Sequence, residues 1–274
     1  MDLTILKNQF LKSFYILKNN PKYVVFSVIF DLLFFAIYGV VSLAIFNVIT
    51  DKSNILLQIA SSNKDSVNQL IAEGKNLFQA MMLQQGFGQG LKSILLLFFA
   101  LMIFIYLVYC VFQGLNWRIA RNLTGSKFRV SEFMKSFFKI NILWLALLYL
   151  GMFFERMIGI LILLSGKKQD TGVIALIIAV IIAYFAFISY ALPVKKGVIK
   201  RSFASGFKKF LIFVPVYVIV AIVFLIINYI LLFAQQINYA LMVVLGFLLF
   251  LPALSWVRVF ICLIINKINK VKNA

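Results

Sequence analysis

Four ionisable residues, Asp31, Glu155, Arg156 and Arg258, lie inside long apolar runs of this sequence. Each costs roughly 2.5–3.5 kcal/mol or more at the centre of a bilayer, so each is a candidate for function or for pairing. At 1.5 Å per residue, Asp31 and Arg258 fall in one half of the membrane and Glu155 and Arg156 in the other. Adjacent helix residues do not face each other, so Glu155 and Arg156 need other partners. We predict that Asp31 pairs with Arg258.

Three interpretations of these charges remain open. They fix helices to one another, they line a polar path for an ion or solute, or the arginines extend along the helix towards the membrane surface. For Arg258, extension towards the membrane surface is the alternative to pairing with Asp31. Asp31 has no such alternative, because an aspartate side chain is too short to reach the surface from that depth.

Other patterns associated with chemistry are missing from the 274 residues. There is no His, which excludes His-ligated metals, Ser-His-Asp triads and histidine proton relays. Cys110 and Cys262 lie in apolar runs without CxxC spacing and are expected to be small buried hydrophobic side chains. No acidic cluster could hold Mg²⁺ or Ca²⁺, and no phosphate-binding loop follows a strand. We therefore predict no catalytic residue, no metal site and no cofactor, and a protein that is not an enzyme.

The elements that carry the four charges follow from composition. Hydrophobic residues make up 64% of the chain and charged residues 13%, which excludes both a water-soluble globule and a disordered chain. A bilayer crossing needs about 20 apolar residues, and six runs are long enough. The predicted fold is therefore all-α, a polytopic transmembrane helical bundle forming one membrane domain over residues 1–274. The six spans are Tyr23–Val48, Ser93–Leu115, Ile140–Leu164, Val173–Leu192, Phe210–Ala234 and Ala240–Ile265.

The net charge of +19 is distributed as a topology signal. Of the 27 basic residues, 19 lie in the strips that precede span one, join spans two and three, join spans four and five, and follow span six. Lys and Arg accumulate on the cytoplasmic side, so residues 1–22, an amphipathic segment, and 266–274, a tail, are predicted to be cytoplasmic. We expect a plasma-membrane (cell-membrane) location and contact with anionic lipid head groups. Nucleic-acid binding is not expected, because no polar module carries a basic groove.

The segment 50–92 is the one long connection and is predicted to be an extracytoplasmic loop. Within it, apolar residues recur at helical spacing from Val67 to Met82, which predicts one amphipathic helix on the outer membrane surface. This helix is either a passive interfacial element or a lid or docking element for a partner.

A Phe-x-x-x-Phe pattern occurs in three of the cytoplasmic strips, with lysines among the aromatic residues. At i, i+4 the two rings share one face of a helix, so each strip is expected to form a short interfacial helix with its rings in lipid. Together the three copies suggest three repeated hairpins. The rings predicted at the lipid interface are Phe10, Phe14, Phe133, Phe137, Phe203 and Phe207.

The strip Gly114-Leu-Asn-Trp-Arg-Ile-Ala-Arg-Asn-Leu-Thr-Gly125, followed by Phe133 and Phe137, resembles the basic loop of six-helix prokaryotic membrane protein families of unknown function. Some of those families look like the membrane domain fused to glycerophosphodiester phosphodiesterases. The segment from Lys195 to Gly206 resembles the same loop more weakly. Residues 130–132 are Val-Ser-Glu and lack the proline common there in those families. The resemblance implies an architecture and brings no phosphodiesterase activity with it.

Two functions are compatible with this sequence. The first is a non-enzymatic membrane scaffold, interaction or assembly protein that contacts a protein partner or a second copy of itself. The alternative is a small permease in which the four intramembrane charges line a path. Paired charges in a dry core favour the first, and a continuous water-accessible cavity favours the second.

Overall fold

The computed structural model of the protein describes residues 3–125, 129–164, 172–192 and 197–271, all of them helical or in the turns between helices. These residues divide into two compact units. One contains residues 1–33 and 109–274, and the other contains residues 34–108. Two long helices, α2 (Pro21–Ser62) and α5 (Phe87–Leu123), contribute to both units.

Among the residues that the structure describes, six helical segments are long and apolar enough to cross a membrane, which confirms the predicted all-α bundle with six spans. Each of them overlaps one predicted span. After α2 and α5 they are α6 (Val130–Leu164), α7 (Gly172–Ala191), α9 (Phe210–Ile237), and the continuous run of α10 (Tyr239–Leu245), the π-helical turn η1 (Gly246–Phe250) and α11 (Leu251–Val271). Helices α2 and α6 exceed the predicted lengths, because no Gly or Pro interrupts residues 49–62 or 130–139.

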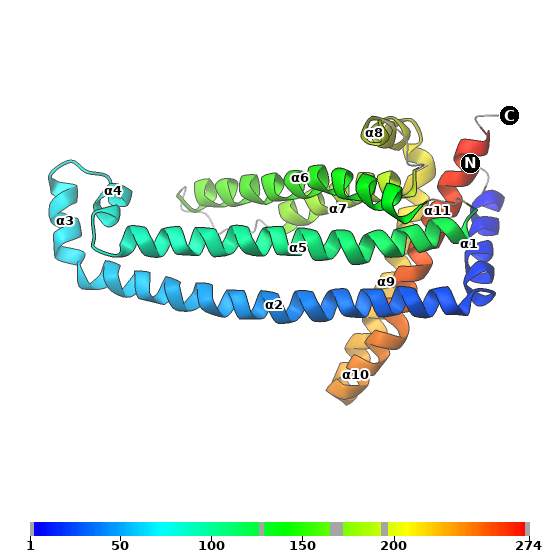
Figure 1. Ribbon diagram of the computed structural model, residues 1–274, viewed down its shortest axis with the longest axis horizontal. Coiled ribbons are helices and arrows are strands. Elements are labelled where there is room, and N and C mark those ends of the chain that lie inside the picture. The colour runs from blue at the N-terminus through cyan, green and yellow to red at the C-terminus, as the bar shows by residue number, and fades with distance from the viewer. Residues whose placement is uncertain (1–2, 126–128, 165–171, 193–196, 272–274) are drawn as a thin grey trace. The chain divides into compact units, whose positions relative to one another are not determined.

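The larger unit is built around α11. Every residue from Ser255 to Ile265 is buried, so neighbours surround this helix on all sides. The short helix α1 (Leu3–Lys18) packs along it, as Figure 1 shows for the blue helix beside the red one. Helices α7 and α9 also contact α11, and α6 packs against α7. A helix that is apolar all round is expected at the centre of a bundle.

Two of the predicted interfacial segments, α1 and α8 (Val198–Lys208), are separate short helices. Phe14 is half-exposed while it stacks on Trp256, and Phe207 is 70% exposed, so both rings leave a surface that lipid can cover. Phe10 packs edge-on against Trp256, and Phe203 packs against Phe185.

The third segment corrects the prediction. Helix α6 begins at Val130 and runs without a break into the span, so Phe133 and Phe137 do not lie on a separate interfacial helix. Both rings are buried, with exposed fractions of 3% and 2%. Phe137 packs against Tyr190 of α7 and Tyr109 of α5, which leaves no face for lipid. The Phe-x-x-x-Phe spacing identified a shared helix face correctly, but that face is covered by protein.

The segment 50–92, which lies in the smaller unit, differs from the predicted loop with one amphipathic helix. Residues 51–62 continue α2, and the single amphipathic helix expected between Val67 and Met82 is two helices, α3 (Lys64–Ala72) and α4 (Leu77–Met82). The chain turns at Gly74, whose φ of +88° favours glycine. Asn76 then begins α4 through a capping box with Gln79. Helices α3 and α4 connect the α2 and α5 parts of this unit (Figure 1).

Candidate functional site

The predicted pair of Asp31 and Arg258 is present in the larger unit and is confirmed in atomic detail. Nη1 of Arg258 donates to Oδ2 of Asp31 at 2.8 Å, and Nη2 donates to Oδ1 at 2.8 Å. Asp31 is completely buried, and Arg258 is 6% exposed. This two-pronged geometry is the strong form of an arginine–carboxylate contact, because the planar guanidinium matches both carboxylate oxygens. It joins α2, near the start of the chain, to α11, near its end.

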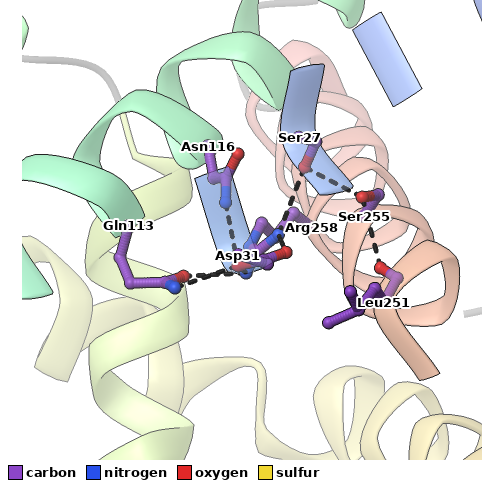
Figure 2. A network of polar contacts seen from close by, with 7 residues as sticks. All are labelled: Ser27, Asp31, Gln113, Asn116, Leu251, Ser255 and Arg258. Carbon is purple, nitrogen blue, oxygen red and sulfur yellow. Dashed lines mark hydrogen bonds and ion pairs between the residues drawn. The ribbon is translucent and has the colours of Figure 1, made fainter. Parts of the chain in front are cut away.

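Two amides of α5 complete the shell around the carboxylate (Figure 2). Nε2 of Gln113 donates to Oδ1 of Asp31 at 3.0 Å, and Nδ2 of Asn116 donates to the same oxygen at 2.9 Å. The other end of the Gln113 amide accepts from Nη2 of Arg258 at 2.7 Å. Gln113 therefore bridges the two charged groups, and the network ties α2, α5 and α11 together.

Two serines extend the network along α2 and α11. Oγ of Ser255 donates to Oγ of Ser27 at 2.8 Å, and Ser27 also accepts from Nη1 of Arg258 at 3.4 Å. An adjoining cavity, lined by Ser27, Asn116, Ser255 and Arg258 among others, measures only about 10 Å³. That is about the smallest volume that holds one water molecule, so this cavity is not a solute path.

The other predicted pair of charges lies on α6. Glu155 is buried, with 6% of its surface exposed. The side chain of Arg156 lies outside the described residues, and its predicted role stays a prediction. Asn228, a polar residue within span five, is exposed on α9.

A second polar cluster, which sequence reasoning missed, joins α5, α6 and α7. The Tyr190 hydroxyl donates to Oδ1 of Asn141, and the Tyr109 hydroxyl lies 3.5 Å from that of Tyr190. One turn further along α6, Nε1 of Trp144 donates to Oγ of Ser189 at 3.0 Å. These contacts lie among stacked aromatic rings and match the use of polar groups to join helices inside a membrane.

Arg121 was counted from the sequence as one of the basic residues of a cytoplasmic strip. The structure buries it to 2% exposure at the C-terminal end of α5. Its Nη1 donates to the carbonyl of Leu192, just beyond α7, at 2.6 Å, and its guanidinium lies 5.7 Å from the centre of the Phe133 ring. A cation at a helix C-terminus satisfies a free carbonyl and opposes the helix dipole.

The partners of Asp31 carry a weak signal in the sequence. Gln113 and Asn116 are three residues apart near the end of a span, Ser27 precedes Asp31 by four residues, and Ser255 precedes Arg258 by three. These spacings place each pair on one helix face. Polar residues that share a face inside three different spans are the feature that could have identified the whole network.

The fold and this network define a multi-pass α-helical membrane protein in which a buried ion pair and the amides around it connect three helices. Among the described residues, no group of three or more Cys, Asp or Glu side chains could hold a metal ion. The chain matches no protein-family model, no curated protein and no solved structure. The resemblance to the membrane domain of glycerophosphodiester phosphodiesterases is thus supported only as a six-helix apolar architecture.

Proposed function

We propose that this protein is a non-enzymatic membrane scaffold or assembly protein of the cell membrane. The observation that carries the proposal is the state of the Asp31–Arg258 pair. Both side chains are buried, and the carboxylate accepts from Arg258, Gln113 and Asn116. A group that binds a passing ion or solute needs open coordination and access, and this pair has partners already and only a water-sized cavity beside it. Its role is to hold helices together.

The orientation in the proposal follows from the basic strips, with both termini in the cytoplasm and the lysines of those strips on anionic head groups. The apolar helices contact the lipid bilayer, and Phe14 and Phe207 supply exposed rings at its surface. On the other side, α3 and α4 present exposed apolar residues, among them Ile71, Leu77 and Phe78, as the surface for a protein partner.

A crosslinking experiment in cells tests the partner surface. A photocrosslinking amino acid replaces Phe78 of α4, and a matched variant carries it at Phe99, a lipid-facing ring of similar exposure on α5. We expect a discrete protein adduct from position 78 and none from position 99. Adducts from neither position, or equal adducts from both, contradict a docking role for α4.

A transport experiment tests the alternative. The full chain is reconstituted into vesicles, and a pH dye and potassium chloride conductance report proton and ion movement. The proposal predicts background rates for the native chain and for the Asp31→Leu/Arg258→Leu variant. A flux that the native chain supports and the double variant loses overturns the scaffold proposal and establishes the permease.

A further inference from the structure

Helix α9 is exposed around most of its circumference outside its buried face, and the exposed residues include one stripe of regular spacing. Its buried residues are Phe213, Val216, Val220, Ile227 and Ala234. The exposed stripe recurs at alternating steps of three and four residues. It consists of Val218, Ala221, Leu225, Asn228, Leu232 and Gln235. Alternating steps of three and four are the spacing by which one helix packs along another. We refer to these six residues as the α9 seam.

Asn228 is the unusual member of the seam. It lies within the apolar span, and at 1.5 Å per residue it is about 7 Å from the middle of α9. Among the described residues, no hydrogen bond involves its side chain. The hydrocarbon of a bilayer contains no polar group that could pair with an amide at this depth. A protein partner that brings a polar group to the same level would supply the hydrogen bond that lipid cannot.

The groove next to Asn228 does not supply that group. It measures about 460 Å³ and is lined by residues of α9, η1 and α11, of which Asn228 alone is polar. The lining residues are Phe224, Ile227, Asn228, Leu231, Phe250 and Leu254. A lipid chain could fill this volume, but it would leave the amide without a hydrogen bond.

We propose that the α9 seam is the interface of a homodimer, in which Asn228 of one copy hydrogen-bonds Asn228 of the second copy. Two copies inserted with the same topology are related by a two-fold axis along the membrane normal, so identical residues meet at identical depth. An amide is both donor and acceptor and is therefore complementary to itself. Ala221, about two turns away, is small enough for the helices to approach closely. The proposal rests on α9 alone and does not depend on the scaffold role.

The first test measures association in lipid. The full chain, labelled at Ser62→Cys in a background without Cys110 and Cys262, is reconstituted in phosphatidylcholine vesicles over a range of protein-to-lipid ratios. Energy transfer between donor-labelled and acceptor-labelled copies reports the dimer. We expect Asn228→Leu to weaken association about tenfold, which is the factor for one intramembrane amide contact. Asn228→Gln keeps the amide and should retain most of it, and Ile226→Leu is the matched control off the seam.

The second test locates the interface without altering Asn228. Under oxidation in native membranes, Ala221→Cys should form a disulfide-linked dimer, whereas Tyr229→Cys, which is 70% exposed and lies off the seam, should not. Three results overturn the proposal: a chain that is monomeric at every ratio, a dimer that Asn228→Leu leaves unchanged, or a crosslink of Ala221→Cys to a different protein in place of a second copy.

Discussion

Removing one member of the Asp31–Arg258 pair should destabilise the protein by more than the pair itself stabilises it, because the other charge stays buried without its partner. In Asp31→Leu, the Arg258 guanidinium loses both carboxylate contacts and keeps only Gln113 at 2.7 Å and Ser27 at 3.4 Å. It remains charged and buried. Breaking a buried pair in this way costs about 3–5 kcal/mol, because an uncompensated charge is left behind. The reverse variant, Arg258→Leu, leaves the carboxylate with two amide donors and falls in the same range.

The double variant Asp31→Leu/Arg258→Leu removes both charges. What it leaves are the amides of Gln113 and Asn116, three residues apart on α5, each of which costs about 1–3 kcal/mol if it stays buried without a partner. We therefore expect a loss of about 2–6 kcal/mol, against about 6–10 kcal/mol for the sum of the two single losses. The midpoints of these two ranges differ by about 4 kcal/mol, which is the expected coupling energy and exceeds the roughly 0.5–3 kcal/mol usual for residues in contact.

The assay is thermal unfolding in mild detergent for the native chain, the two single variants and the double variant. At about 2–4 °C per kcal/mol for a chain of this size, each single variant should lower Tm by on the order of 10 °C. The control cycle combines Asp31→Leu with Arg121→Leu. Arg121 donates to the carbonyl of Leu192 and belongs to another cluster, so these two losses should add.

Additive losses in the Asp31–Arg258 cycle would refute the reasoning. So would a double variant whose loss exceeds the sum of the two single losses. In those cases the pair would contribute only as two separate polar groups, and the connection of α2 to α11 would depend on apolar packing alone.

Two further predictions concern the aromatic strips and the topology. Phe137→Ala should cost about 3–5 kcal/mol of stability, because this ring of α6 is buried against α5 and α7. Phe207→Ala removes an exposed ring and should change stability by less than about 0.5 kcal/mol. Thermal unfolding in detergent compares the two variants, and equal losses would contradict the difference in burial. In a chain without its native cysteines, Ser62→Cys should react with a membrane-impermeant thiol reagent on intact cells, and Ala204→Cys only after the membrane is opened. The reverse pattern would place the termini outside.

The depth of a residue along its helix could be predicted from the sequence, and its neighbours could not. Asp31 and Arg258 were paired correctly because a charge in hydrocarbon needs a partner and only these two lie at matching depth in one half of the membrane. The rotation of a helix about its axis, which decides which residues it contacts, could not be predicted in the same way as depth. Nearly all faces of these spans are apolar, so the hydrophobic pattern does not distinguish a face that meets lipid from one that meets protein. A related limit applies to Phe133 and Phe137 in the strip before span three: their i, i+4 spacing predicted a shared helix face and did not distinguish lipid from protein as the neighbour of that face.

Helix ends in the segment 50–92 could have been predicted more closely. Gly74 is a signal for the end of a helix, and Asn76 followed by Gln79 is a signal for the start of the next. These local residues are sufficient to predict the turn between α3 and α4. The continuation of α2 to Ser62 is also local, since no Gly or Pro interrupts residues 49–62.

Composition and periodicity by themselves determined the class of this protein, its six apolar helices and the depth of its charges, because these depend only on the cost of placing each residue in hydrocarbon. Tertiary structure alone decided that Gln113, Asn116 and Ser27 surround the ion pair, that α11 is the central helix, and that Arg121 is buried against the end of α7. The reason is geometric. Contacts between helices depend on which faces turn towards each other, and in spans that are apolar on every side that choice is made by the packing of all the helices together.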